Sequence, residues 1–375
     1  TRQDIVEINC HGGPVPLRQV LDLCLAHGAR LAGPGEFTLR AFLNGRVDLA
    51  QAEAVADLVE AKTEAGLRLA VSQLEGHLSS QIRELRARLL HALAWVEASI
   101  DFDEDEVPSY GIEEDLLYAR QRLADLISGS ERGLIYRQGL RTAIVGRPNT
   151  GKSSLLNALL RTDRAIVTPI PGTTRDTLEE TLNLNGIPLL LVDTAGIRSN
   201  TRDLAEDLGV ERSRNALRQA DLALLVIDGN APLTAEDHEI ADLIGDKPAL
   251  VVINKTDLPV FADEAAILPG VPRVELSALT GEGIADLERS IEALVFSGQV
   301  VASDAALVSS PRHRDVLRRA HAHIVEALSA HSAGMLADLI SIDLRAAVDA
   351  LGEITGETVS ETLLATIFGR FCIGK

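Results

Sequence analysis

The octapeptide Gly146–Ser153 constrains this chain more than any other segment. It reads G-R-P-N-T-G-K-S, follows the run Thr142–Val145 and precedes a stretch of helical periodicity over Ser153–Leu160. Between a strand and a helix, such a loop turns backbone N–H groups inward around phosphates, Lys152 reaches the β and γ phosphates, and Ser153 can hold Mg²⁺. We therefore predict a P-loop on an α/β sheet and prefer it to a chance glycine-rich turn.

Apolar periodicity divides the rest of the chain. Residues 139–298 alternate short apolar strands with helical stretches, which predicts an α/β domain with a largely parallel sheet. Helical periodicity fills residues 47–138 and returns over residues 299–375. Residues 1–46 are rich in Gly and Pro and indicate a small α+β piece. We expect a multidomain chain in which the α/β P-loop domain is inserted into a discontinuous all-α helical domain, preceded by the small α+β piece.

Charge, hydropathy and cysteine usage narrow the class of protein. Lys and Arg total 36 against 55 Asp and Glu, and the formal charge of −19 argues against a broad basic surface for nucleic acid. No apolar run approaches the ~18 residues of a membrane span and the first residues lack a signal peptide's apolar stretch, so we expect a soluble, cytoplasmic protein with no membrane partner. Cys10, Cys24 and Cys372 are odd in number and far apart, which favours reduced thiols over a disulfide framework or a zinc site. Because no Met precedes Thr1 and residues 4–9 already alternate like a strand, we expect that the N-terminus of a longer protein is missing.

Three further motifs, each directly after an expected strand, decide which nucleotide binds. Asp193–Gly196 reads D-T-A-G, where an Asp can hold Mg²⁺ through water and a Gly N–H can meet the γ phosphate. Asn254–Asp257 reads N-K-T-D, and its last carboxylate can accept two hydrogen bonds that guanine donates and adenine cannot. Ser277-Ala278 stands where a backbone contact to the guanine O6 is usual. Together with the P-loop, these motifs in this order predict GTP.

The motifs resemble those of the translation-factor-type GTPase superfamily and, more narrowly, the MnmE (TrmE) family of tRNA modification GTPases. The narrower resemblance is carried by residues 146–154, by P-G-T-T-R-D at 171–176, by residues 34–46 before L-A-Q-A-E-A at 49–54, and by the terminal F-C-I-G-K at 371–375. It covers the whole chain. It implies the C-terminal part of a tetrahydrofolate-binding, dimerising domain at 1–46, two halves of a helical domain at 47–138 and 299–375, and a G domain at 139–298.

The resemblance also implies an activity. Members of the family hydrolyse GTP and, with an FAD-dependent partner called MnmG (GidA) and a methylene- or formyl-tetrahydrofolate, add an aminomethyl-type (carboxymethylaminomethyl) group to C5 of the wobble uridine in certain tRNAs. The implied assemblies are a homodimer, a heterotetramer with the partner, and a complex with tRNA.

Ile197 stands directly after the D-x-x-G glycine, where many GTPases carry a Gln that orients the attacking water. Isoleucine forms no hydrogen bond, so this water and the charge that develops between the β and γ phosphates need other partners. The resemblance implies that a potassium ion is bound by Asn149, Thr168, Ile170 and Thr173 when two G domains dimerise. It further implies Mg²⁺ on Ser153 and Thr174. From chemistry alone, Asp203, Glu206 or Asp207 could act on the water, and the resemblance implies a general base at Glu206 acting through a bridging water. A turn-stabilising role for Asn149 and a solvated helix N-terminal acid at Glu206 are the competing interpretations.

These arguments give the candidate site residues. The GTP-binding candidates are Asn149, Thr150, Gly151, Lys152, Ser153, Ser154, Thr168, Thr173, Thr174, Asp193, Thr194, Ala195, Gly196, Asn254, Lys255, Asp257, Ser277 and Ala278. The catalytic candidates are Lys152, Glu206 and Cys372. The resemblance implies folate contacts at Glu7, Arg46 and Lys375 and a role for the Cys372 thiol on the uridine ring or the activated folate, against the alternative of a frayed terminus with an idle thiol.

Two other functions fit parts of the sequence. A ribosome-assembly GTPase shares the Asn-bearing P-loop, but its RNA-binding KH module needs a G-x-x-G loop, and no two glycines of this chain stand three apart. A regulatory GTP switch on a helical scaffold is the third interpretation, which the terminal C-I-G-K and the region of Arg46 argue against.

Overall fold

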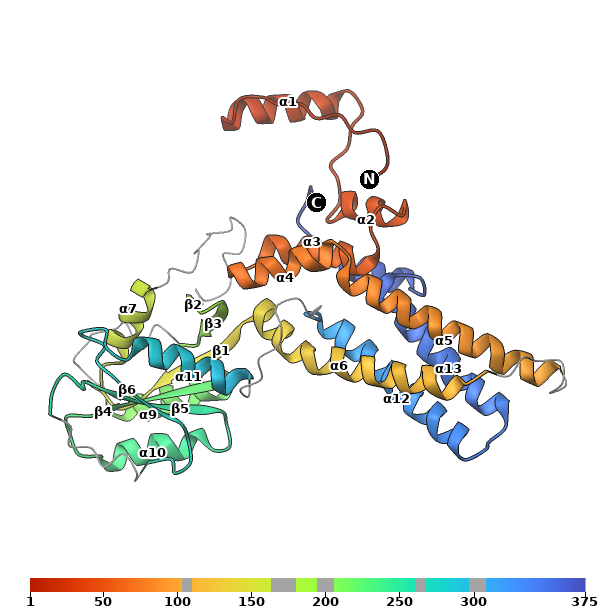
Figure 1. Cartoon of the computed structure of the whole chain (residues 1–375). Coiled ribbons are helices and arrows are strands. Elements are labelled where there is room, and N and C mark those ends of the chain that lie inside the picture. Colours follow the sequence, from red (N-terminus) through yellow and green to blue (C-terminus); the bar gives the residue numbers. More distant parts are fainter. Residues whose placement is uncertain (103–109, 163–179, 194–205, 260–266, 297–307, 375) are drawn as a thin grey trace. The chain divides into compact units, whose positions relative to one another are not determined.

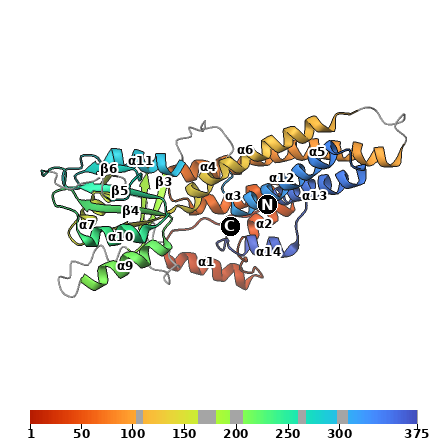
Figure 2. The ribbon, with the colours of Figure 1, turned by 90° about the horizontal axis from the view of Figure 1, so that it is seen from below.

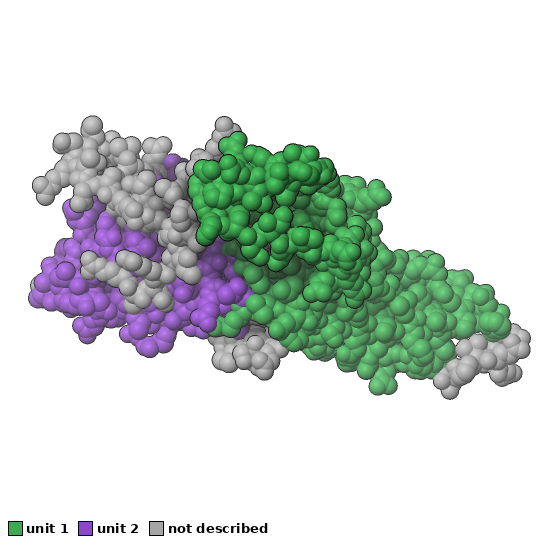
Figure 3. Space-filling view, turned by 90° about the horizontal axis from the view of Figure 1, so that it is seen from above, with its two compact units in different colours: residues 1–60, 68–130, 306–375 green, residues 61–67, 131–305 purple. Residues whose placement is uncertain are grey.

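The computed structural model describes residues 1–102, 110–162, 180–193, 206–259, 267–296 and 308–374 (Figure 1). The chain forms two compact units, coloured separately in Figure 3. The helical unit comprises residues 1–60, 68–130 and 306–375, and the sheet unit comprises residues 61–67 and 131–305. The helical unit is thus discontinuous in sequence, and the sheet unit is inserted into it, as the periodicity predicts. Within the described ranges, no helix has the length and apolar character that crossing a membrane requires.

The sheet unit is built on one twisted sheet with the strand order β2-β3-β1-β4-β5-β6. Its strands are β1 (Leu140–Val145), β2 (Glu180–Leu184), β3 (Ile187–Leu191), β4 (Leu222–Asp228), β5 (Ala249–Asn254) and β6 (Arg273–Leu276). All neighbours pair in parallel except β2 and β3, which form an antiparallel hairpin. Strands β3 and β5 are buried along their whole length, as expected for strands covered on both faces.

Helices cover both faces of this sheet. Apolar side chains of α7 (Lys152–Thr162) and α11 (Ile284–Phe296) pack with one face, and those of α9 (Glu206–Gln219) and α10 (Ala235–Ile244) with the other. Figure 2 shows α11 on the opposite side of the sheet from α9 and α10. Successive residues of β1 alternate between the two cores, since Ile144 joins the first and Ala143 and Val145 the second. This is a doubly wound α/β fold, whose ligand sites lie at the carboxyl ends of its parallel strands.

The core of the helical unit lies between helices that precede and follow the sheet unit in sequence. Its long members are α5 (His77–Asp101), the first part of α6 (Ile112–Gln138), α12 (Pro311–Ser332) and α13 (Ala337–Thr355), which run side by side in Figures 1 and 2. The shorter helices are α1 (Pro14–Ala26), α2 (Glu36–Leu43), α3 (Leu49–Glu60), most of α4 (Glu64–Leu74) and α14 (Glu361–Phe368). Leu85, Leu89, Leu93 and Val96 recur on one face of α5 and are all buried, as their spacing predicts.

One local expectation is wrong. Residues 4–9, which alternate like a strand, belong to no helix or strand and are exposed. A strand requires a neighbour to pair its backbone N–H and C=O groups, and among the described residues none pairs with this segment.

Candidate functional site

The P-loop connects β1 to α7 and has a backbone that two glycines make possible. Gly146 has a φ of +149° and Gly151 a φ of +96°. A Cβ at Gly146 would collide with the carbonyl of Val226 on β4, and one at Gly151 with the amide nitrogen of Asn254. Asn149, exposed at the tip of the loop, has a φ of +66°, a left-handed conformation that Asn tolerates better than most residues.

Lys152, the first residue of α7, extends its side chain back over this loop. Its ammonium donates hydrogen bonds to the carbonyls of Gly146 at 2.7 Å and Arg147 at 2.8 Å. Burial lowers the pKa of the Lys152 ammonium to about 8. A partly desolvated ammonium beside the backbone of the P-loop favours binding of a phosphate anion, because the anion would stabilise the charge of Lys152.

Asn254, at the end of β5, joins the P-loop to the loop after β6. Its side-chain nitrogen donates to the carbonyl of Thr150 at 2.8 Å, and its side-chain oxygen accepts from the backbone N–H of Ala278 at 3.0 Å. Because the side chain is buried, both bonds form away from water and are strong. The structure therefore brings together three predicted site segments from three strand ends.

The other residues of the N-K-T-D motif take different partners. The exposed carboxylate of Asp257 accepts a hydrogen bond from the Ser277 hydroxyl at 2.7 Å, which fixes its orientation. Lys255 has a φ of +71° and forms an ion pair with Asp228 at the end of β4, at 2.6 Å. An oriented carboxylate with free acceptor capacity is the group that a guanine edge needs.

An ion pair that the sequence did not predict joins the P-loop to α10. Arg147 contacts Asp237 of α10, with 3.2 Å between the guanidinium Nε and a carboxylate oxygen, and the Asp237 side chain is only 2% exposed. The same carboxylate accepts from the N–H and the hydroxyl of Thr234, both at 2.9 Å, in a capping box. The T-x-x-D pattern at 234–237 signals the capping box, but no local pattern links it to Arg147.

Four more predicted residues lie in the described part of the chain. Asp193, exposed and with a φ of +59°, follows β3; Ser153 is half-buried and Ser154 is exposed on α7. Glu206 is the first residue of α9. Several residues discussed in the sequence analysis lie outside the described residues: Thr168, Ile170, Thr173, Thr174, Thr194, Ala195, Gly196, Ile197 and Lys375.

Two of the three predicted folate residues, Glu7 and Arg46, lie in the described part of the chain. Glu7 and Arg46 are exposed, and no hydrogen bond or ion pair between these two described residues occurs. The predicted catalytic cysteine, Cys372, is an exposed free thiol.

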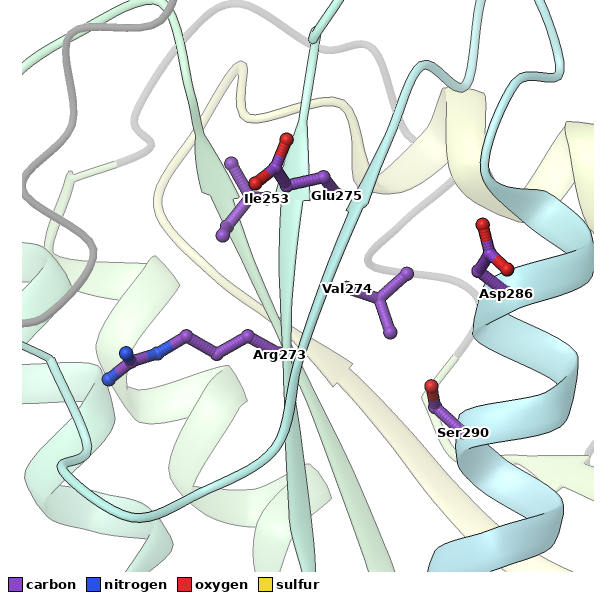
Figure 4. A pocket seen from close by; sticks show the side chains of 6 residues that line it. All are labelled: Ile253, Arg273, Val274, Glu275, Asp286 and Ser290. Atoms are coloured by element: carbon purple, nitrogen blue, oxygen red, sulfur yellow. The ribbon is translucent and has the colours of Figure 1, made fainter.

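A separate pocket of about 290 Å³ lies at the sheet edge formed by β6. It is lined by Ile253, Arg273, Val274, Glu275, Asp286 and Ser290. In Figure 4, Val274 points toward α11 whereas Arg273 and Glu275 point to the other side of the strand. The polar groups therefore do not converge, and no predicted site residue lines the pocket.

At the carboxyl edge of a parallel sheet, a P-loop is joined through hydrogen bonds of Asn254 to the N-K-x-D and Ser-Ala loops. This arrangement defines a P-loop GTPase. A family model described as the MnmE helical domain matches residues 49–372, and one described as the GTP-binding protein TrmE N-terminus matches residues 1–46. The chain belongs to the MnmE family of tRNA modification GTPases.

Individual relatives are similar along the whole chain. The tRNA modification GTPase MnmE of Geobacillus kaustophilus is 51% identical over 382 residues, covering 100% of this chain and 82% of that protein. MnmE of Roseiflexus castenholzii is 51% identical over 389 residues, covering 100% of this chain and 83% of that protein. Among solved structures, the G domain of the T. maritima FeoB iron transporter is 24% identical, covers 41% of this chain and 98% of that chain, and gives a TM-score of 0.28.

Proposed function

We propose that this chain couples potassium-stimulated GTP hydrolysis in its sheet unit to modification of the tRNA wobble uridine. The observation that carries the GTP part is the side chain of Asn254, which ties the phosphate-binding loop to the Ser-Ala loop beside Asp257. This link would hold the phosphate contacts and the base contacts of one nucleotide in a fixed relation to each other.

The residues present fit a magnesium-bound guanine nucleotide. Because Gly146 and Gly151 carry no Cβ, the loop can approach Val226 and Asn254 closely and turn as a phosphate-binding loop must, and Lys152 supplies a cation whose charge is otherwise poorly solvated. The hydroxyls of Ser153 and Thr174 would hold Mg²⁺, which when bound neutralises phosphate charge. Asp257, already oriented by Ser277, would accept the two guanine hydrogens.

Hydrolysis needs charge stabilisation that Ile197 cannot give. The exposed Asn149 side chain stands on a left-handed turn at the tip of the P-loop, where its oxygen can serve as a cation ligand. We infer that Asn149, with Thr168, Ile170 and Thr173, holds K⁺, which when bound adds positive charge between the β and γ phosphates. Glu206, at the start of α9, would accept a proton from the attacking water through a bridging water.

The modification chemistry belongs to the helical unit and to partners. We propose that residues 1–46 are the C-terminal part of a folate-binding and dimerising domain, that 47–138 and 299–375 are halves of the helical domain, and that 139–298 is the G domain. Glu7, Arg46 and Lys375 would contact a tetrahydrofolate one-carbon donor, since a carboxylate pairs with pterin amino groups and the two cations with the folate glutamate. Cys372 would act on the uridine or the folate.

The proposed assembly is a cytoplasmic homodimer that joins the FAD-dependent partner MnmG (GidA) in a heterotetramer and acts on tRNA. The carboxymethylaminomethyl group at C5 of the wobble uridine is the proposed product. The similarity to MnmE proteins over the whole chain supports this proposal.

The test is the modified-nucleoside profile of tRNA from cells that lack this protein, measured by liquid chromatography and mass spectrometry. The proposal predicts loss of the wobble uridine modification, restored by the wild-type chain and not by Lys152→Ala. An unchanged tRNA profile with accumulation of ribosomal precursors would instead support a ribosome-assembly GTPase.

A further inference from the structure

The last residues of the chain are attached to the turn that begins α2, more than 300 positions earlier in the sequence. The backbone N–H of Gly35 donates to the carbonyl of Cys372 at 3.4 Å, and Pro34 and Ile373 form an antiparallel β-bridge. Both segments belong to the helical unit. The residues around Cys372 are therefore not a frayed terminus, because their backbone pairs with residues 34–35.

Side chains just before Cys372 anchor the same segment. Phe368 is 3% exposed and Phe371 is 7% exposed, and their ring centroids lie 5.3 Å apart. They form a small apolar cluster with Leu49 and Ala52 of α3. Burying two phenylalanine side chains stabilises the position of this short segment. Cys372 itself is exposed, so its backbone is fixed while its thiol faces solvent.

Gly35 makes this close approach possible. Its φ is +63°, and a Cβ on it would lie 2.9 Å from the carbonyl oxygen of Phe368 and 3.0 Å from the Cβ of Phe371. Any other residue would push the tail away from the turn.

The turn beside Gly35 is itself held by charge. The carboxylate of Glu36 accepts hydrogen bonds from Arg30 at 2.5 and 2.8 Å, from the N–H of Gly33 at 2.9 Å and from Arg40 at 2.7 Å. The Arg30 and Gly33 hydrogen bonds in particular lower the pKa of Glu36 to about 2, so the group stays ionised near neutral pH. The surface that receives the tail is thus a defined loop.

We propose that Gly35 and Phe371 are positioning residues for the Cys372 thiol in the tRNA modification reaction. Gly35 permits the contact, Phe371 fills the apolar cluster, and together they present the thiol at one place beside residues 30–46. This inference rests on the proposed role of Cys372.

The experiment compares Gly35→Ala with Gly45→Ala in the full chain. Both glycines have a similar left-handed φ, +63° and +66°, so alanine carries a similar backbone strain at each. A Cβ at Gly45 meets nothing nearer than the Arg2 guanidinium at 3.7 Å, whereas one at Gly35 strikes the tail. The two variants therefore differ in the tail contact.

Three quantities are measured for each variant: wobble uridine modification in cells, the GTP hydrolysis rate, and the rate of Cys372 alkylation by a maleimide in a Cys10→Ser, Cys24→Ser background. Gly35→Ala is expected to lower modification at least tenfold and to change the alkylation rate at least threefold, with GTP hydrolysis within twofold of wild type. Gly45→Ala is expected to leave all three near wild type. Equal modification and equal alkylation in the two variants would overturn the proposal.

Two further variants keep the test decisive. If Gly35→Ala does not accumulate, Phe371→Ala should lose modification and Phe371→Leu should restore most of it; equal modification by both would contradict the positioning role. Cys372→Ser tests the underlying function separately. If that variant modifies tRNA normally, the role of Cys372 and its positioning both fail, while a changed alkylation rate in Gly35→Ala would still establish the structural contact.

Discussion

Removing Arg147 should destabilise the sheet unit through the charge left behind on Asp237. That carboxylate is 2% exposed, and its contact with Arg147 is 3.2 Å. Breaking a buried ion pair by removing one partner costs about 3–5 kcal/mol. The two hydrogen bonds from Thr234 would continue to stabilise the charge. We therefore expect Arg147→Ala to cost ~3 kcal/mol.

Hydrogen exchange read by mass spectrometry measures this loss in the sheet unit alone. A cost of ~3 kcal/mol corresponds to about 100-fold faster exchange of the most protected amides of β1 and β4. Asp237→Asn in the Arg147→Ala background should recover most of the protection, because the buried group is then neutral. Arg218→Ala, which removes an exposed arginine of the same unit, is the matched control. Exchange in Arg147→Ala as slow as in Arg218→Ala would refute this reasoning.

Three other predictions concern the guanine contact, the potassium ion and a buried carboxylate of the helical unit, Glu53 of α3, which contacts Arg312 at 2.8 Å and His313 at 3.0 Å. Asp257→Asn should weaken GTP binding and favour xanthosine nucleotides, whose O2 accepts a hydrogen bond from the new amide. An unchanged GTP affinity in a titration would show that Asp257 does not contact the base. GTP hydrolysis should be markedly faster in KCl than in NaCl at equal ionic strength. Asn149→Ala should lose this difference and still bind the nucleotide. Equal wild-type rates in both salts would show that potassium takes no part in hydrolysis. Burial raises the pKa of the Glu53 carboxyl, but the charges of His313 and Arg312 outweigh it and lower this pKa to about 2. Because the folded-state pKa lies below the usual 4.5, about 3 kcal/mol of stability is present above pH 4.5 and is lost as the pH falls toward 2. Glu53→Gln should therefore weaken the pH dependence of the thermal unfolding midpoint over this range. A pH dependence equal to that of the wild type would contradict the pairing.

Local motifs predict which segments meet at the carboxyl edge of the sheet, because each is a short segment at a strand end. The P-loop, N-K-T-D and Ser-Ala segments follow β1, β5 and β6, and parallel strands bring their carboxyl ends to one edge. Periodicity also predicts the inserted arrangement, and the core shared by α5, α6, α12 and α13 confirms that the two helical parts pack together.

Contacts between distant segments are what the sequence could not predict. The pairing of Arg147 with Asp237 and of Gly35 with Cys372 depends on tertiary placement, which no local spacing encodes. Helical periodicity likewise cannot tell that residues 61–67 belong to the sheet unit, where the Thr63 hydroxyl donates to the carbonyl of Gly186 at 2.9 Å. Residues 4–9 show the converse, since an alternating pattern forms no strand where no neighbour pairs with it.

We propose that one chain carries a GTP site in its sheet unit and a modification site that includes Cys372 in its helical unit. The most direct measurement uses cells whose only copy of this protein is Cys372→Ser, with the wobble uridine of their tRNA quantified by mass spectrometry and the GTP hydrolysis of the purified variant measured beside it. We expect loss of the modification with GTP hydrolysis at the wild-type rate, because the P-loop lies in the sheet unit and Cys372 in the helical unit. Wild-type levels of the modified uridine in those cells would contradict it.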